Sequence, residues 1–197
     1  MKKHIKFLLI LLAVAVSCSE KSGYTKLNKS YTVRENLIKN IKPNIPILYW
    51  KYVWTISNKA MYEFGDSNLL KKYKVAEPNY GFFPECFPGM CYSYIMYIDK
   101  NGINYVTNEQ SLRKFIGRID NVSEAILIGR TEGLGVDSKN AKGGSYKKTK
   151  TGFKLNMAKS KKCPIEYESI LFEIDFNGKY KMKSNGVYKT LPGCIIS

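Results

Sequence analysis

Histidine is almost absent from this chain of 197 residues. The one histidine, His4, lies next to an apolar run near the start, in a segment that we expect to be removed. The working protein would then contain no imidazole. This excludes Ser-His-Asp and Cys-His catalysis, histidine general bases and metal sites that need histidine. We therefore assign no catalytic residue, no metal and no cofactor.

Arginine and acidic residues are also scarce. Of the 32 basic residues only Arg34, Arg113, Arg118 and Arg130 are arginines, and 16 acidic residues leave a formal net charge of +16. Lysine is a weaker bidentate phosphate ligand than the planar guanidinium of arginine. This composition argues against specific phosphate recognition, and we expect no nucleic-acid partner.

Long hydrophobic runs are absent. The longest, Phe7–Val16, would span about 15 Å as a helix, half of a bilayer core of about 30 Å, and no later segment reaches 18 apolar residues. Lys2, Lys3 and Lys6 precede the run, and small residues follow it. A basic start, a short apolar run and small residues are typical of a secretory signal peptide, here residues 1–17.

The residues after this run, Ala15-Val16-Ser17-Cys18, resemble the lipobox of bacterial lipoproteins. The resemblance covers residues 1–18 and implies cleavage before Cys18, whose thiol then carries a diacylglycerol and whose amine is acylated. Ser19 resembles the residue found there in lipoproteins sorted to the outer membrane. The expected location is therefore outside the cytoplasm, anchored by lipid, with the outer membrane favoured. Ordinary secretory cleavage after Ser17 is the alternative.

Removing Cys18 to lipidation leaves an even number of cysteines. Their spacing does not fit paired Cys-x2-Cys zinc ligands, and an oxidising compartment favours disulfides. Of the three pairings, we predict Cys86–Cys91 and Cys163–Cys194.

The hydrophobic fraction of 44% is sufficient for a packed core. We predict a lipidated Cys18 with a flexible, polar tether over residues 18–30, followed by one globular α+β domain over residues 31–197. An ordered arm is the alternative to the tether.

Three helices are indicated in this domain. Residues 33–42 have apolar side chains at helical spacing. A second helix begins after Thr107 or Asn108, and a third after Asn121, where Glu124 has the capping-box spacing. The segment from Gly129 to Gly135 is expected to end the third helix.

Strand patterns surround these helices. Residues 47–56 indicate a buried strand, residues 92–98 and 103–106 indicate a hairpin, and residues 146–191 indicate a β-meander with turns at Asn177-Gly178 and Asn185-Gly186. The predicted fold is an antiparallel sheet with two or three short helices packed on one face.

Lysines are concentrated between residues 141 and 164, where no acidic residue occurs. They are Lys142, Lys147, Lys148, Lys150, Lys154, Lys159, Lys161 and Lys162. Such a segment could contact anionic lipid, an acidic polysaccharide or an envelope protein. A merely solvated surface is the more common explanation of such a segment.

Two other features offer different functions. The carboxylate pairs Glu166/Glu168 and Glu173/Asp175 would suit a glycan hydrolase, although acid pairs on a strand are usually its solvated side. Tyrosines between Tyr24 and Tyr80 could form a binding platform.

We expect a lipid-anchored envelope lipoprotein that acts as a non-catalytic binding module. The alternatives are an envelope-glycan hydrolase and an inhibitor of a secreted enzyme.

Overall fold

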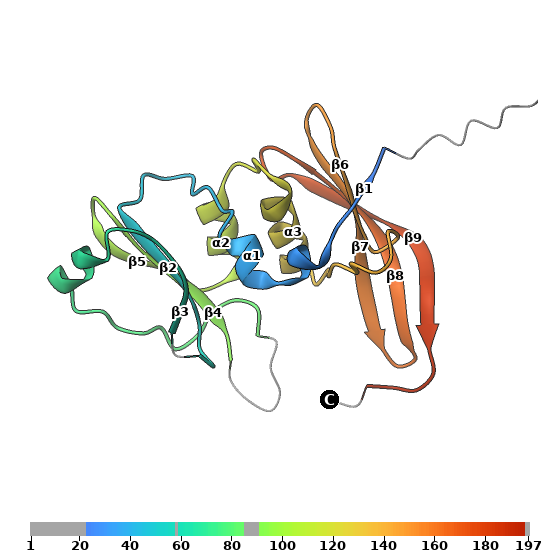
Figure 1. Cartoon of the computed structure of the whole chain (residues 1–197), viewed down its shortest axis with the longest axis horizontal. Coiled ribbons are helices and arrows are strands. Elements are labelled where there is room, and N and C mark those ends of the chain that lie inside the picture. The colour runs from blue at the N-terminus through green and yellow to red at the C-terminus, as the bar shows by residue number, and fades with distance from the viewer. Residues whose placement is uncertain (1–22, 58, 85–90, 196–197) are drawn as a thin grey trace, which may run out of the picture.

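The computed structural model describes residues 23–57, 59–84 and 91–195 (Figure 1). In chain order the elements are β1 (Thr25–Lys26), η1 (Lys29–Thr32), α1 (Arg34–Ile38), β2 (Tyr49–Trp54), β3 (Lys59–Gly65), η2 (Ser67–Lys72), β4 (Ser93–Asp99), β5 (Gly102–Val106), α2 (Glu109–Ile116), α3 (Val122–Thr131), β6 (Gly144–Lys148), β7 (Gly152–Lys162), β8 (Ile165–Asp175) and β9 (Tyr180–Leu191).

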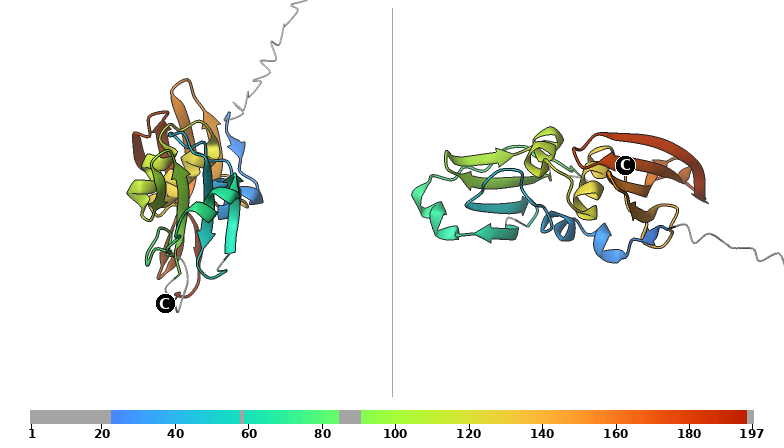
Figure 2. Two further views of the ribbon diagram at one scale, coloured as in Figure 1. Left: turned by 90° about the vertical axis from the view of Figure 1, so that its left-hand side faces the viewer. Right: turned by 90° about the horizontal axis from the view of Figure 1, so that it is seen from above.

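Two antiparallel sheets lie at opposite ends of the molecule with the helices between them (Figures 1 and 2). The strand orders are β3-β2-β4-β5 and β1-β6-β7-β8-β9. The α+β class is confirmed, but the expected single sheet is wrong. The β4–β5 hairpin leads directly into α2 and α3, and these helices separate the first set of strands from the meander.

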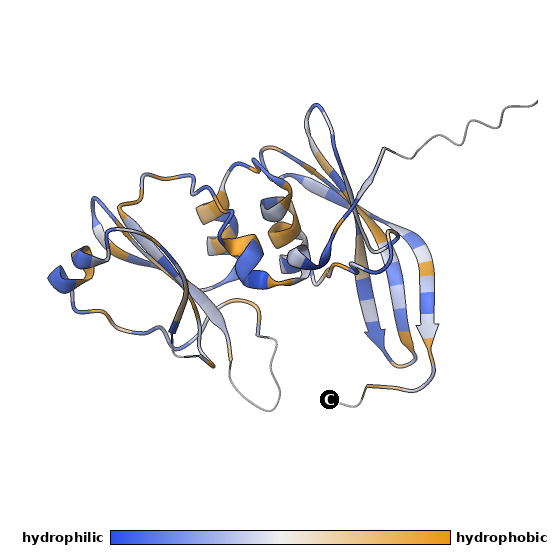
Figure 3. Ribbon diagram, viewed as in Figure 1, coloured by the Kyte–Doolittle hydropathy of each residue, from blue (hydrophilic) through white to orange (hydrophobic). Residues whose placement is uncertain are grey.

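One apolar core joins both sheets to the helices. Trp50 and Ile95 from the four-stranded sheet belong to the same buried cluster as Leu112 of α2, Ile126 of α3 and Phe172 of β8. Figure 3 shows apolar residues on the helices at the centre of the molecule. A smaller cluster, which includes Tyr49 and Met96, covers the other face of the four-stranded sheet.

Capping signals predict where α2 and α3 begin, whereas the helix expected over residues 33–42 is shorter, because α1 ends at Ile38. Asn108 with Ser111, and Asn121 with Glu124, form capping boxes that begin α2 and α3. As expected, α3 ends within the segment from Gly129 to Gly135, at Thr131, and Gly129 itself lies inside the helix. A Cβ at Gly129 would lie 2.5 Å from the sulfur of Met157, so this glycine allows α3 to approach β7 closely.

The expected tether is wrong for the described part of residues 18–30. Thr25 and Lys26 pair with β6, and Leu27 is 0% exposed within the main core. The Asn28 side chain then caps η1 by accepting a hydrogen bond from the Ser30 amide at 2.8 Å. One buried leucine and two strand pairs fix a segment whose polar composition resembles a linker.

The meander is present, with one turn misplaced. Asn177-Gly178 forms the β8–β9 turn, and Gly178 has a φ of +80°. Asn185-Gly186 instead lies inside β9, where the register with β8 shifts. A left-handed glycine is compatible with either a turn or a bulge, so this dipeptide alone cannot distinguish them.

A disulfide joins Cys163 to Cys194, as predicted, with the two Cα atoms 4.4 Å apart. It ties the β7–β8 turn to the segment after β9. Cys86 lies outside the described residues, so the Cys86–Cys91 pairing stays a prediction and only one of the two expected disulfides is observed. Residues 1–22, including Cys18, also lie outside. No helix of the described residues is long and apolar enough to span a membrane.

The buried N-terminal arm gives a stability prediction. Leu27→Ala should lower the free energy of unfolding by about 2–5 kcal/mol, because it leaves a cavity in the main core. Urea unfolding measures this change, with exposed Lys29→Ala as the control. A loss below about 0.5 kcal/mol, typical of surface substitutions, would show that the arm is not part of the core.

Candidate functional site

The five-stranded sheet has two chemically different faces. Residues alternate between the faces of a strand, so the buried side chains of β7 and β8 fix the direction of their neighbours. Leu155 and Phe172 are paired across these strands and both belong to the main core. We call the opposite face, which points away from the helices, the outer face.

Lysines are concentrated on the outer face. Strand register places seven of them there: Lys26, Lys147, Lys154, Lys162, Lys181, Lys183 and Lys189. The strand acids on this face are Glu173 and Asp175. On the helix side of the same strands, the charges are more evenly balanced. This side carries Lys148, Lys159 and Lys161 together with Glu166 and Glu168. The excess of positive charge therefore belongs to one side of the sheet.

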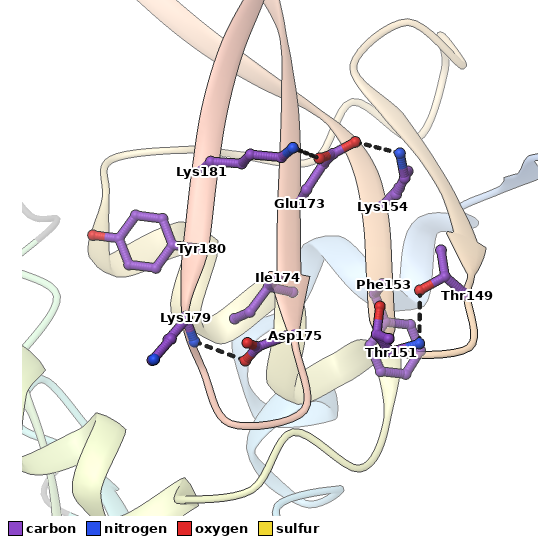
Figure 4. Close-up of a pocket in the computed structure, with 10 residues that line it drawn as sticks. All are labelled: Thr149, Thr151, Phe153, Lys154, Glu173, Ile174, Asp175, Lys179, Tyr180 and Lys181. Atoms are coloured by element: carbon purple, nitrogen blue, oxygen red, sulfur yellow. Dashed lines mark hydrogen bonds and ion pairs between the residues drawn. The ribbon is translucent and has the colours of Figure 1, made fainter.

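One cross-strand row contains the strongest part of this charge. Lys147, Lys154, Glu173 and Lys181 lie side by side on β6, β7, β8 and β9. The Glu173 carboxylate lies 2.5 Å from the Lys154 ammonium and 2.7 Å from that of Lys181 (Figure 4). A single carboxylate thus serves two lysines, and the row keeps a net positive charge.

The ionisation of this row follows from its contacts. Hydrogen bonds from Lys154 and Lys181 lower the pKa of Glu173, and the bond to Glu173 raises the pKa of Lys154. Both shifts favour the charged forms of Glu173 and Lys154. Asp175 does not neutralise the row directly, because its carboxylate accepts the backbone amides of Asn177 and Lys179 at 2.8 and 3.0 Å.

Lys147 lies directly opposite Lys154, its partner in the β6–β7 register. Like charges in this position destabilise a sheet by tenths of a kcal/mol or more. No acidic side chain in the described part of the chain forms an ion pair with Lys147. The sheet thus tolerates a repulsive pair on an exposed surface.

The eight lysines selected from the sequence do not share one face. Lys147, Lys154 and Lys162 are on the outer face, whereas Lys148, Lys159 and Lys161 are on the helix side. Lys142 and Lys150 lie in connections outside the strands. Sequence reasoning grouped these lysines on one surface because it used a continuous segment instead of the two-residue alternation of each strand.

Sequence reasoning also missed outer-face lysines from both edges of the sheet. Lys26 comes from β1, and Lys181, Lys183 and Lys189 come from β9. The alternation Lys179-Tyr-Lys-Met-Lys183 was the available signal for part of this set. Its alignment with β7 depends on strand order, which the spacing of residues does not give.

The carboxylates considered for hydrolysis have other partners. Glu166 pairs with Lys161 at 3.1 Å, and Glu168 accepts a hydrogen bond from Ser184. The lowered pKa of Glu173 is opposite to the raised pKa that a general acid requires.

Burial raises the pKa of the Glu124 carboxyl group. It accepts the backbone amides of Lys42, Asp120 and Asn121 and caps α3. These contacts give Glu124 a structural role.

Two of the tyrosines considered for a binding platform are core residues. Tyr49 and Tyr52 are each 0% exposed and lie in the two apolar clusters on opposite faces of β2. Tyr24, by contrast, lies beside the outer face, where it lines a hollow.

No group of three or more His, Cys, Asp or Glu side chains that could hold a metal ion occurs within residues 23–57, 59–84 and 91–195. The comparisons with known proteins give no relative: no family model, no curated protein and no solved structure matches this chain.

The repulsion between Lys147 and Lys154 can be measured directly. Lys147→Gln should raise the free energy of unfolding by about 0.2–1 kcal/mol at low salt, and the gain should shrink at high salt. Urea unfolding of this variant is compared with that of Lys148→Gln, on the other face of β6. Equal effects of the two substitutions would contradict a specific repulsion across β6 and β7.

Proposed function

We propose that this chain is a lipid-anchored envelope lipoprotein whose outer face binds anionic groups of the envelope, without catalysis. The observation that carries the binding proposal is the row in which Lys154 and Lys181 share the Glu173 carboxylate and Lys147 faces Lys154 across the strands. An anionic ligand would relieve this repulsion on binding. The lipid anchor rests on the resemblance of residues 15–18 to a lipobox.

Sheet geometry makes this surface suitable for phosphate or carboxylate groups. Neighbouring strands lie about 4.8 Å apart and alternate residues of a strand about 6.8 Å apart. The lysines therefore form a two-dimensional array that can meet several anions together. Such an array gives salt-sensitive attraction, since charges are screened over about 8 Å at physiological ionic strength.

The position of β1 supports a role close to the membrane. Thr25 is seven residues after Cys18, and an extended chain spans at most about 3.6 Å per residue. With Cys18 lipidated, the β1 edge of the sheet would lie within about 25 Å of the membrane. The outer face would then be within reach of anionic lipid headgroups and of polymers near them.

Vesicle co-sedimentation tests this proposal. Residues 19–197, which contain every helix and strand of the described structure, are mixed with phosphatidylglycerol or phosphatidylcholine vesicles across a salt series. Circular dichroism first establishes that each variant is folded. Binding to the anionic vesicles should be salt-sensitive. The double variant Lys147→Gln/Lys154→Gln should weaken it roughly tenfold to thirtyfold, at about 1 kcal/mol per lysine near an anionic surface.

Lys148→Gln/Lys159→Gln is the matched control, because it removes the same charge from the helix side. It should change vesicle affinity by less than threefold. Glu173→Gln should strengthen binding, since it frees Lys154 and Lys181 from their shared carboxylate. Equal losses of vesicle affinity in the two double lysine variants would show that only net charge matters, and would overturn the proposal. Absence of binding at low salt would also overturn it.

A further inference from the structure

A hollow of about 420 Å³ lies on the outer face, between β1, the connection before β6 and the middle of β9. Its floor consists of Ser145, Asn156 and Ser169, which come from β6, β7 and β8. Ser145 and Ser169 are only 2% and 4% exposed, although they are on the outer face. The surrounding segments therefore rise above the sheet and enclose a polar floor.

The bulge in β9 builds one wall of this hollow. The register with β8 shifts near Asn185-Gly186, and Gly186 has a φ of +88°, which favours glycine. The Asn185 amide nitrogen consequently lies 3.4 Å from the amide oxygen of Asn156. Bulges commonly redirect a side chain toward a functional surface, and here the redirected group is a neutral amide.

Close packing at Gly143 fixes the neighbouring tyrosine. A Cβ at this position would lie 2.2 Å from the Tyr188 hydroxyl, so only glycine leaves room for the ring. The hydroxyl donates to Asp137 at 3.1 Å, which holds Tyr188 at the edge of the hollow. Tyr24 lines the hollow from the segment before β1.

The polar groups of the floor are connected. The Asn156 amide donates to the Ser145 hydroxyl at 3.0 Å, and that hydroxyl donates to the Ala141 carbonyl at 2.7 Å. This arrangement fixes the orientation of the Asn156 side chain. Its amide oxygen is directed toward the Asn185 side of the hollow.

Positive charge comes from the rim. Lys26 and Lys142 line the hollow, and none of the described residues that line it is acidic. The Lys26 ammonium donates to the Lys139 carbonyl at 3.0 Å, which leaves two of its three donors for other partners. The lining thus combines ammonium groups, neutral amides, hydroxyls and two aromatic rings.

We propose that this hollow binds a sugar ring that carries a negatively charged substituent, as one unit of an acidic glycan. Amides and hydroxyls match the mixed donors and acceptors of sugar hydroxyl groups, tyrosine rings pack against the apolar face of a sugar, and the lysines pair with its anion. The volume is within the usual range of small-ligand sites. This inference rests on the proposed function, because it specifies what the outer face binds.

Isothermal titration of residues 19–197 with trigalacturonic acid tests the inference. Neutral galactotriose and inorganic phosphate are the comparison probes. Trigalacturonic acid should bind at least tenfold more tightly than either. Asn185→Ala should weaken the binding of trigalacturonic acid about tenfold. The vesicle affinity of the same variant should stay within twofold of that of the unchanged chain. The double variant Lys26→Gln/Lys142→Gln should lower the affinity for the acidic sugar more than the double variant Lys148→Gln/Lys159→Gln does.

The outcomes separate this inference from the proposed function. If the vesicle result holds but Asn185→Ala leaves trigalacturonic acid binding unchanged, the sugar site is overturned and the anionic outer face remains. If phosphate binds as tightly as trigalacturonic acid, the hollow recognises charge alone and the sugar site is also overturned. If the acidic sugar binds through Asn185 but vesicle binding fails, the sugar site stands and the lipid-headgroup role of the face is lost.

Discussion

The register of β7 is the constraint on which both the core and the charged surface depend. Leu155 and Met157 must face the helices, because both are fully buried in the main core. Their position sends Lys154 and Asn156 to the outer face. A shift of one residue would bury lysine and expose leucine, so burial of the apolar side chains specifies the charged array as strictly as it specifies the core.

This coupling separates stability from binding on the two sides of the same strands. The helix side carries the packing, and at its exposed end the charges are paired, as in Lys161 with Glu166. The outer face instead leaves Lys147 opposite Lys154 and lets two lysines share Glu173. Proteins generally tolerate such unfavourable arrangements where another requirement offsets the loss of stability. The proposed anion binding would be such a requirement.

Sequence reasoning succeeded where the signal is local. The capping boxes at Asn108 and Asn121 predict the helix starts because cap and partner are three residues apart. It failed where the arrangement is set by distant pairing. Lys26 joins the lysine array through β6, and nothing near Lys26 in the sequence indicates that partner. The division into two sheets was missed for the same reason, since spacing along the chain does not specify strand order.

The most direct test of the account is a map of which backbone amides respond to an anionic surface. Nuclear magnetic resonance of residues 19–197 with phosphatidylglycerol bicelles provides it, with neutral bicelles as the reference. If the outer face binds anions, we expect shifts and broadening at Lys147, Lys154 and Lys181, and little change at Lys148 and Lys159. Perturbation concentrated on the four-stranded sheet, or spread equally over both faces of the five-stranded sheet, would contradict it.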